Sequence, residues 1–237
     1  MAPSPIDVPL IHRLRRLFDP VLRYHRFTAH GLEHVPRTGP ALLVVHHTLA
    51  TYDGVLIAGA IWDAIGRIPR GLGDDRIFQT PVLGSLAARV GIVPASPDAG
   101  EALLRAREIV AVAPGGMWES LRPRTERRRG RWEGRKGFVR LALRTGAPMI
   151  LAACPAADDL YTVYPNPVTD RLYQRFHLPV PVARGIGPTL LPRRVRLTAW
   201  IAPPIVPPPW DPAREAAQID ALHETASAAM RDLLTRE

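Results

Sequence analysis

Cysteine and long apolar runs are nearly missing from this sequence. Cys154 is the only cysteine, which excludes a disulfide framework or a cysteine-based zinc site and favours a reducing, cytosolic compartment. No apolar run reaches the roughly eighteen residues of a membrane span, because the nearest candidate, DGVLIAGAIWDAIG, is short and is interrupted by Asp63. Residues 1–20 have no apolar core between their charges, so we expect neither a spanning segment nor a secretory signal.

Lysine is equally scarce, since Lys136 is the only one, yet the net charge is +9. The excess positive charge is therefore almost entirely arginine. Such a charge implies an anionic partner, which can be nucleic acid, a membrane surface or a small molecule that carries phosphate. The length of 237 residues, of which 46% are hydrophobic, fits one folded domain with a large core.

Strand and helix patterns alternate through most of the chain. We predict a strand, a turn at Pro36 and Gly39 and a second strand within 25–45, and further strands at 108–114, 148–154 and 194–201. We predict helices at 53–65, 81–89, 97–107, 135–144 and 211–237, with Ser96 as an N-cap and Gly146 as a stop signal. Residues 155–190 show no assignable pattern. The alternation predicts a single α/β domain, a mixed and mostly parallel sheet flanked by helices.

The first segment predicts a basic amphipathic helix that Pro20 should break or kink. Apolar residues fall at helical spacing between arginines, at Leu10, Leu14, Leu17, Val21 and Leu22. Such a helix packs on the domain or lies on an anionic membrane surface, and the pattern leaves both interpretations open. We therefore divide the chain into an N-terminal helix at 1–26 and a domain at 27–237.

Two hydrolase patterns fail on their context. HGLEH, at 30–34, matches the His-x-x-Glu-His string of a zinc peptidase family, whose histidines must share one helix face. Here Gly31 lies inside the string and Pro36 follows, so we expect a turn with surface histidines, and zinc hydrolysis stays an alternative. No serine has the Gly-x-Ser-x-Gly surroundings of a nucleophile elbow. Cys154 ends an apolar strand, which favours a buried small side chain.

The apolar run ALLVV, at 41–45, leads directly into His46 and His47, and Asp53 begins the next predicted helix. The carboxyl end of a strand is where an α/β fold displays its chemistry. Asp53 can accept one ring N–H of His47, which would fix the tautomer and leave the other nitrogen free to take a proton. Alternatively, Asp53 only caps the helix and His47 is a buried polar residue.

A second predicted strand ends in PGGMWES, at 114–120. Gly115 and Gly116 allow the backbone to approach a ligand closely and to present N–H groups to a phosphate or an oxyanion. Glu119 is then placed to bond a glycerol-type hydroxyl or to hold a nearby arginine. A plain tight turn is the alternative.

The order of these pieces resembles the glycerolipid acyltransferase superfamily, the lysophospholipid acyltransferases, and within it the monoacylglycerol and diacylglycerol acyltransferase branch. The resemblance begins at GLEHVPRTGPALLVVHHTLATYDG and passes through GDDRIFQTPVLGSLAARVGIVPASPDAGEALLRAREIVAVAPGGMWES. It then reaches RKGFVRLALRTGAPMILAA and so covers about residues 30–154. A weaker similarity is present in RVRLTAWIAPPI and the last predicted helix.

The motifs follow the family's order along the chain. His47 and Asp53 stand at the family's His-x4-Asp motif, with His46 in the place of its usual Asn. The gap is one residue longer and resembles the His-Gly-x-x-Pro-x-Asp variant of the diacylglycerol acyltransferase branch. Arg76, in DDRIFQTP, falls at the second motif. The third, PGGMWES, resembles that branch's Pro-Gly-Gly-x-x-Glu and contains Pro114, Gly115, Gly116 and Glu119.

The resemblance implies a glycerol-3-phosphate acyltransferase-like fold, with residues 27–237 as the acyltransferase domain. It implies transfer of a fatty acyl group from acyl-CoA or acyl carrier protein to a hydroxyl of a glycerolipid or related lipid, without a metal or cofactor. His47 would be the general base and Asp53 its partner. The implied substrate-binding residues are His46, Arg76, Pro114, Gly115, Gly116 and Glu119.

The family's own variations refine these expectations. Trp118 stands where many members carry Arg, which disfavours a glycerol-phosphate acceptor and favours a neutral one. Transmembrane anchors are common in the family, whereas here we expect peripheral contact with an anionic surface on the cytoplasmic face of the membrane. A non-catalytic lipid-binding protein on the same fold remains the alternative.

The stretch LRPRTERRRGRWEGRK, at 121–136, concentrates arginine. A solvated loop is our first interpretation of it, followed by contact with lipid headgroups or CoA phosphates. We expect no nucleic-acid partner, because one tryptophan without a series of stacking aromatics makes a poor nucleic-acid surface.

Overall fold

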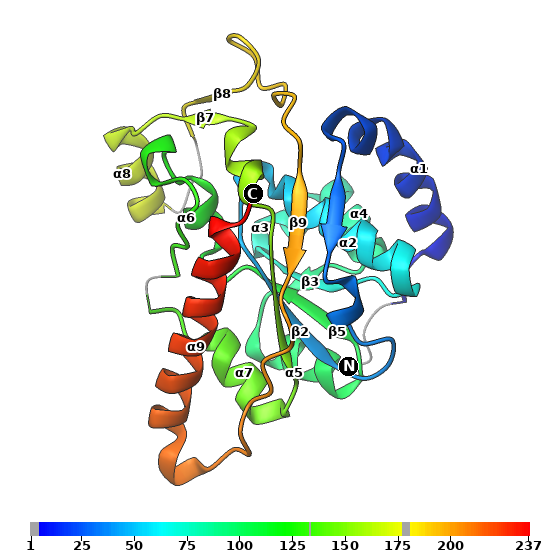
Figure 1. Cartoon of the computed structure of the whole chain (residues 1–237), viewed down its shortest axis with the longest axis vertical. Helices are drawn as coiled ribbons and strands as arrows, with labels where there is room; N and C mark the ends of the chain where they lie inside the picture. Colours follow the sequence, from blue (N-terminus) through cyan, green and yellow to red (C-terminus); the bar gives the residue numbers. More distant parts are fainter. Residues whose placement is uncertain (1–4, 133, 177–180) are drawn as a thin grey trace.

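A computed structural model of the chain describes residues 5–132, 134–176 and 181–237. Within them, one large sheet consists of β1 (Thr28–His30), β2 (Ala41–Val45), β3 (Arg70–Gly73), β4 (Val93–Pro94), β5 (Ile109–Val112), β6 (Met149–Ala153) and β9 (Thr198–Ile201). The spatial order is β1-β9-β6-β2-β5-β3-β4 (Figure 1). The five strands from β6 to β4 pair in parallel, whereas β9 is antiparallel to β6 and parallel to β1. The predicted mixed, mostly parallel sheet is confirmed.

Helices connect these strands and cover both faces of the sheet. They are α1 (Val8–His25), α2 (Tyr52–Ile65), α3 (Asp75–Gln79), α4 (Pro81–Arg89), α5 (Pro97–Arg105), α6 (Gly116–Ser120), α7 (Gly137–Thr145), α8 (Pro167–Phe176) and α9 (Glu215–Thr235). The predicted Ser96 N-cap and the Gly146 stop are both confirmed, the first by a 3.0 Å bond to Ala99 N–H and the second by a left-handed φ of 66°.

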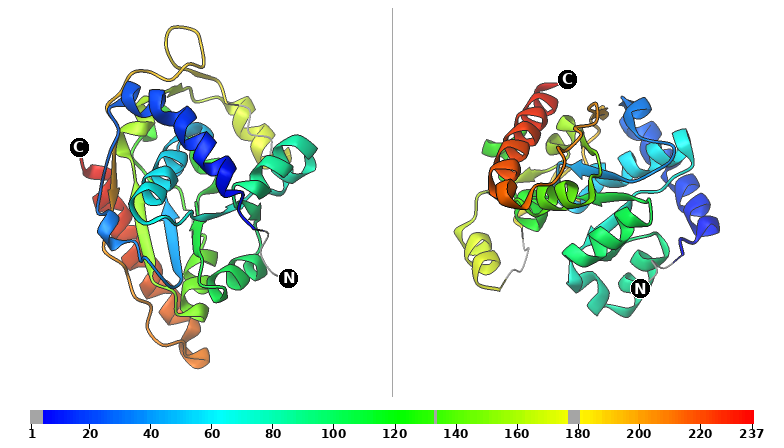
Figure 2. Two further views of the ribbon diagram at one scale, coloured as in Figure 1. Left: turned by 90° about the vertical axis from the view of Figure 1, so that its right-hand side faces the viewer. Right: turned by 90° about the horizontal axis from the view of Figure 1, so that it is seen from below.

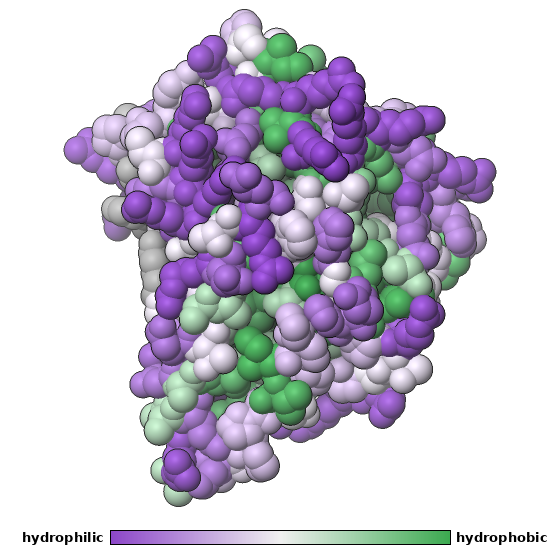
Figure 3. All heavy atoms as spheres, viewed as in Figure 1, coloured by the Kyte–Doolittle hydropathy of each residue, from purple (hydrophilic) through white to green (hydrophobic). Residues whose placement is uncertain are grey.

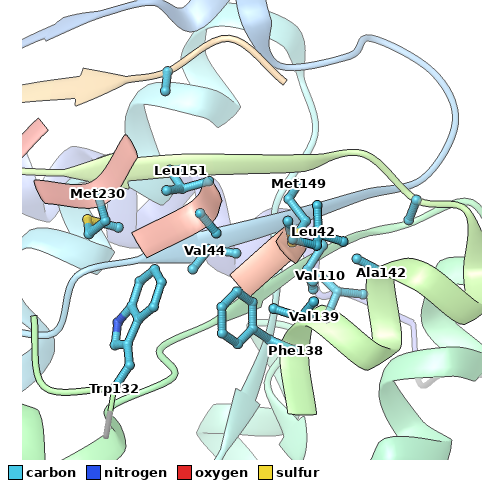
Figure 4. Close-up of a cluster of buried hydrophobic side chains, with 14 of the residues drawn as sticks. Leu42, Val44, Val110, Trp132, Phe138, Val139, Ala142, Met149, Leu151 and Met230 are labelled. Atoms are coloured by element: carbon cyan, nitrogen blue, oxygen red, sulfur yellow. The ribbon is translucent and has the colours of Figure 1, made fainter. Parts of the chain in front are cut away.

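Strand β2 is buried on both faces, which explains why its sequence is continuously apolar. Leu42 and Val44 pack on one side with residues of α5, α7 and α9 (Figure 4). Leu43 packs on the other side with Ile57 of α2. Each fully buried Leu or Ile contributes roughly 1.5–3 kcal/mol relative to an exposed one. The sheet is therefore fixed from both sides, with α1 and α9 on opposite sides of the molecule (Figure 2).

Residues 155–190, which show no assignable sequence pattern, contain a short 3-10 helix η4 (Pro155–Asp159), the helix α8 and a second sheet of β7 (Thr162–Val163) with β8 (Ala183–Arg184). The two strands are antiparallel and only two residues long. Strands this short carry too few residues for a period-2 pattern to be recognised.

Helix α1 is continuous through Pro20, so of the predicted break or kink the break is wrong. Proline in mid-helix removes one backbone hydrogen bond, and here packing on the domain offsets that loss. Phe18, Val21 and Leu22 pack into a cluster with Leu56 and Leu160.

Most of the apolar stripe of α1 faces the domain, and Leu17, 71% exposed, is the exception among its five residues. Ion pairs add to this contact, because Arg15 lies 2.6 Å from Asp63 of α2 and Asp7 lies 2.8 Å from Arg89 of α4. In the described part of the chain, no helix is both long and apolar enough to cross a bilayer.

The carboxyl ends of the parallel strands meet at one edge of the sheet, which lies toward the top of Figure 1. The register pairs Val44 of β2 with Val112 of β5 and with Leu151 of β6. The segments that follow these strands therefore come together, although they lie far apart in the sequence. These segments are the His46–His47 pair after β2, the PGG turn (114–116) after β5 and η4 after β6.

Candidate active site

His47 lies at the exit of β2, and its surroundings select one tautomer. Its Nδ1 atom is 3.0 Å from the backbone oxygen of Thr48. A carbonyl oxygen can only accept a hydrogen bond, so Nδ1 carries the proton in the neutral ring and Nε2 has the free lone pair. The residue is 8% exposed, whereas the neighbouring His46 is 1% exposed. The arrangement leaves His47 a nitrogen that can take a proton.

Asp53 is connected to His47 by hydrogen bonds through Thr48. The Thr48 hydroxyl donates to Asp53 Oδ1 at 2.6 Å, and Oδ2 is buried without a hydrogen-bond partner. Among the described contacts, no hydrogen bond or ion pair joins Asp53 to the His47 ring. Burial raises the pKa of this carboxyl, and the bond from Thr48 offsets part of the shift. Thr48 thus contacts both members of the predicted pair, through its carbonyl and its hydroxyl.

The five residues between His47 and Asp53 contain a 3-10 turn, η2 (Leu49–Thr51), and end at Tyr52, where α2 begins. This turn accommodates the extra residue of the motif. Thr51 adopts a left-handed φ of 54°, a strained conformation for a β-branched residue that costs about 1–3 kcal/mol. Asp53 lies inside the first turn of α2, and its carboxylate accepts from a side chain and not from the helix backbone. The capping interpretation of Asp53 is therefore wrong.

His46 belongs to a buried cluster of four charged or ionisable groups. Its Nε2 atom is 2.6 Å from Arg122 Nη2, and its Nδ1 atom is 3.3 Å from Glu119 Oε1. Arg122 Nη2 also donates to Asp158 Oδ1 at 2.6 Å. We call His46, Glu119, Arg122 and Asp158 the charged cluster, and all four side chains are at most 8% exposed.

The charged cluster favours a proton on His46. Burial opposes that charge, but the carboxylates of Asp158 and Glu119 outweigh it and raise the pKa of His46 to about 9. With a neutral imidazole the cluster would hold two carboxylates against one guanidinium, a buried net charge of −1. When His46 is protonated, its Nε2 atom can no longer accept a hydrogen bond from Arg122. The Nε2–H group then lies 3.7 Å from Asp158 Oδ2. Burial raises the pKa of Asp158, but the contacts with His46 and Arg122 outweigh burial and hold this pKa below its usual range.

Glu119 connects the charged cluster to the backbone of His47. It is 0% exposed, and its Oε2 atom accepts from the His47 N–H at 3.2 Å. Its Oε1 atom accepts from the Arg131 N–H at 3.0 Å. Of the two roles predicted for Glu119, the contacts describe the one that holds an arginine, since Arg122 lies 3.9 Å away. Burial opposes the ionised form, yet the contact with His46 holds the pKa of Glu119 below its usual value.

The PGG turn is shaped by the same carboxylate. A Cβ on Gly115 would lie 2.4 Å from the Glu119 Cβ, so only glycine fits there, and Gly116 has a left-handed φ of 54°. The N–H of Gly116 donates to the Ala113 oxygen at 2.9 Å. Arg135 donates to the backbone oxygens of Pro114 and Gly115. The structure thus uses the Gly116 N–H within the turn, and this group is not available to an oxyanion.

Arg76 and Trp118 also lie outside the charged cluster. Arg76 is in α3, after β3, and Asp74 caps that short helix by accepting from the Arg76 N–H at 2.9 Å. Trp118 stacks on Tyr173 at a ring distance of 5.2 Å, and the Arg131 guanidinium lies 5.0 Å from the Trp118 ring. A guanidinium from elsewhere in the chain therefore covers the tryptophan that replaces the family's usual arginine.

Sequence reasoning missed Arg122, Asp158 and Thr48. Arg122 lies in the stretch 121–136 that we predicted to be a solvated loop, yet it is 5% exposed, so that prediction is wrong for this residue. Composition could not separate it from the exposed arginines that follow. Asp158 lies in the region without a pattern. Thr48 was recognisable only by its place beside His47.

The remaining sequence hypotheses have simple outcomes. HGLEH does not form a helix: His30 ends β1, Gly31 is left-handed with a φ of 81°, and His34 lies in a 3-10 turn, η1 (Leu32–His34). The two histidines therefore do not share the helix face that the zinc peptidase pattern requires. His30 is exposed and stacks on Trp200, and His34 contacts the Ile201 oxygen at 3.0 Å. Cys154 is buried, as predicted, and burial raises the pKa of its thiol.

Comparisons with known proteins agree with the fold and with the resemblance to acyltransferases. The family model described as Acyltransferase matches residues 26–154, just over half of the chain. The chain belongs to this acyltransferase family.

The relatives cover a range of organisms. An uncharacterized protein of Mycobacterium tuberculosis is 32% identical over 192 residues, which are 75% of this chain and 53% of that protein. A Homo sapiens protein named "DGAT1/2-independent enzyme synthesizing storage lipids" is 25% identical over 210 residues, 88% of this chain and 62% of the relative. The chain thus spans about half the length of the mycobacterial relatives that it matches.

The crystal structure of the 1-acyl-sn-glycerophosphate acyltransferase PlsC from Thermotoga maritima superposes with a TM-score of 0.60. The match covers 96% of this chain and 80% of PlsC, at 11% sequence identity. At this identity the similarity shows the fold, and the predicted acyltransferase-like architecture is confirmed.

Proposed function

We propose that the protein transfers a fatty acyl group from acyl-CoA or acyl carrier protein to a hydroxyl of a glycerolipid or related lipid, with His47 as general base. The observation that carries the proposal is the hydrogen bond from His47 Nδ1 to the Thr48 oxygen. It leaves Nε2 with a lone pair at the edge of the sheet where this class of fold displays its chemistry. Membership of the acyltransferase family supports the reaction class.

The reaction needs one base and no covalent enzyme intermediate, because the donor thioester is already activated. His47 Nε2 removes the proton of the acceptor hydroxyl as the oxygen attacks the thioester carbonyl. The carbonyl oxygen becomes negative in the tetrahedral intermediate. Its collapse breaks the carbon–sulfur bond, and the imidazolium returns the proton to the departing thiolate. The products are the acyl ester and a free thiol, so atoms and charges balance.

Asp53 supports His47 indirectly, through Thr48. Its carboxylate accepts a hydrogen bond from the Thr48 hydroxyl, and the Thr48 carbonyl accepts a hydrogen bond from the Nδ1–H group of His47. The carboxylate therefore holds the residue that fixes the ring, and its negative charge stabilises the imidazolium through space. Glu119 positions the same histidine from the other side by accepting its backbone N–H.

The substrates are proposed from charge and chemistry. CoA and the carrier-protein arm both present phosphate, which suits a chain with a net charge of +9. A neutral acceptor is favoured because Trp118 replaces the usual phosphate-binding arginine of the family. The acceptor lies in a membrane, so we propose a peripheral position on an anionic surface at the cytoplasmic face.

An acceptor screen tests the proposal. The purified chain is incubated with one labelled acyl-CoA, or with the acyl carrier protein, and detergent-dispersed monoacylglycerol, diacylglycerol or lysophospholipid, and products are read by mass together with thiol release. Wild type should form an ester and free thiol in equal amounts, and His47→Ala should not. His30→Ala, which changes an exposed histidine of HGLEH, is the matched control and should keep the wild-type rate.

Two results would overturn the proposal. Acyl transfer at close to the wild-type rate by a well-folded His47→Ala protein would exclude the base, and lipid binding without thiol release by wild type would indicate a non-catalytic lipid-binding protein. A chelator should leave the rate unchanged. If chelation stopped the reaction and zinc restored it, the HGLEH hypothesis would return.

A further inference from the structure

The loop between β8 and β9 exposes large apolar side chains at the end of the molecule where the carboxyl edge of the sheet lies (Figure 1). Ile186, Leu190 and Leu191 are 48%, 68% and 62% exposed, and we call them the apolar tip. Figure 3 shows hydrophobic atoms at this end beside hydrophilic ones. Single exposed apolar residues are ordinary, but a group of them marks a contact surface.

The loop backbone holds the apolar tip in place. The Gly185 N–H donates to the Thr189 oxygen at 2.6 Å, and the Ile186 N–H donates to the Leu191 oxygen at 2.9 Å. The chain crosses itself so closely that a Cβ on Gly185 would lie 1.8 Å from the Leu191 oxygen. The loop is therefore a shaped, hydrogen-bonded turn, and the exposure of the tip does not come from fraying.

Arginines flank the apolar tip in the sequence, and no acidic residue lies among them. Residues 181–197 contain Arg184, Arg193, Arg194 and Arg196 and neither Asp nor Glu. Arg194 and Arg196 are exposed, and in the part of the chain that the structure describes they make no ion pair. Apolar side chains flanked by unpaired cations complement an anionic lipid surface, where the apolar groups enter the acyl region and the guanidinium groups remain among the phosphates.

The same loop is tied to the candidate active site. Arg193 donates through Nη1 to the Asp159 oxygen at 3.2 Å, and its N–H donates to the Leu160 oxygen at 3.1 Å. Asp159 follows Asp158, a member of the charged cluster. The last turn of α1 also reaches the loop, since Tyr24 donates to the Pro192 oxygen at 3.1 Å. A surface held by these contacts has a fixed orientation relative to His47.

We infer that the apolar tip and Arg194 and Arg196 dock the protein on an anionic lipid bilayer with the site end facing the membrane. The inference rests on the proposed function, since a lipid acceptor must be reached from the bilayer. It assigns membrane contact to this loop and not to α1, whose apolar stripe packs on the domain except for Leu17. The loop then inserts its three apolar side chains while the sheet edge with His47 lies behind it.

Vesicle sedimentation tests the assignment on the full chain without any turnover. The probes are vesicles of phosphatidylcholine and of phosphatidylcholine mixed with phosphatidylglycerol, each at low and high salt. Wild type should bind the anionic vesicles and release them at high salt. Leu190→Glu with Leu191→Glu should bind at least about tenfold more weakly. Arg194→Gln and Arg196→Gln should each weaken low-salt binding roughly fivefold, from about 1 kcal/mol per charge near an anionic surface.

Leu17→Glu is the matched control, because it changes an equally exposed leucine on α1 and should bind like wild type. All these side chains are exposed, so we expect each variant to fold, and thermal melting checks this. The inference is overturned if the tip variants bind like wild type, if Leu17→Glu loses as much affinity, or if wild type ignores anionic vesicles at low salt. It is also overturned if wild type self-associates without lipid and the tip variants do not, since the tip would then be an interface between copies.

A separate measurement of turnover tests the proposed function. Turnover on detergent-dispersed acceptor does not need docking, so the tip variants should keep it while losing turnover on acceptor embedded in vesicles. Failure of vesicle binding with intact detergent turnover removes this inference and the proposed peripheral position, and it leaves the proposed reaction. Vesicle binding without any turnover removes the proposed reaction and leaves the docking surface.

Discussion

Two adjacent histidines have opposite surroundings. His46 is held between two carboxylates and a guanidinium in the charged cluster, whereas the ring of His47 contacts the oxygen of its own neighbour. A histidine fixed in a buried ionic cluster keeps its proton, because releasing it leaves uncompensated charge. A histidine with one ring nitrogen bonded to a backbone oxygen has its other nitrogen available for proton transfer. The pair therefore divides positioning and chemistry between consecutive residues.

The largest expected effect separates the two histidines by activity. His47→Ala should lower acyl transfer by about 10²–10⁴-fold, because the general base is lost, with little change in the unfolding free energy. The measurement is the rate of thiol release at saturating donor. His46→Ala should be milder for the chemical step and harsher for stability. A larger rate loss in His46→Ala than in His47→Ala, with both proteins folded, would reverse the assignment of base and support.

The charged cluster should break when one partner is removed. Asp158→Asn leaves the Arg122 guanidinium and a protonated His46 facing one carboxylate, and we expect a loss of about 3 kcal/mol in the free energy of unfolding. Urea denaturation measures it. Asp159→Asn is the matched control, since Asp159 is partly exposed and its ion pair with Arg127 should contribute less than about 1 kcal/mol. Equal losses in the two variants would mean that burial gives the cluster no special importance.

Thr48→Val tests whether Asp53 acts through the hydroxyl. The change removes the donor to Asp53 Oδ1 and keeps the size of the side chain and the carbonyl that holds His47. A buried carboxylate left without its hydrogen bond should cost about 1–3 kcal/mol of stability, and the rate of transfer should fall. Thr48→Ser restores the hydroxyl and should recover both. If Thr48→Val kept the wild-type rate, Asp53 would have no connection to the base through this residue.

The smallest expected effect is the pH dependence that His46 contributes. Its pKa is raised in the folded state, so its stabilisation is complete below the ordinary value near 6.5 and is lost as the pH rises through about 9. Glu119 and Asp158 have lowered pKa values and act at the other end, where stability is lost as the pH falls through their carboxyl range. Melting temperatures of wild type and His46→Asn, compared from pH 6 to about 10, should converge toward high pH. A constant difference across that range would contradict a charged His46.

The fold could be predicted because its signals are local. The run ALLVV is apolar at every position since β2 is buried on both faces, and α4 begins and ends where its proline and its arginine predicted. Pro20 shows the limit of such rules, because the packing of α1 on the domain maintained a helix that its sequence should interrupt. The two-residue strands β7 and β8 carry too little pattern to be recognised at all.

The candidate site divides in the same way. His47, Asp53 and the PGG turn follow strands and are visible in order along the chain, so the sequence by itself determined which residues stand at the edge of the sheet. Which of them touch was decided only by the tertiary structure. Asp53 and His47 are joined through Thr48, and Glu119, Arg122 and Asp158 meet around His46 from segments after three different strands. A buried charge acquires its partners from wherever the chain folds back, and that geometry has no period or spacing in the sequence.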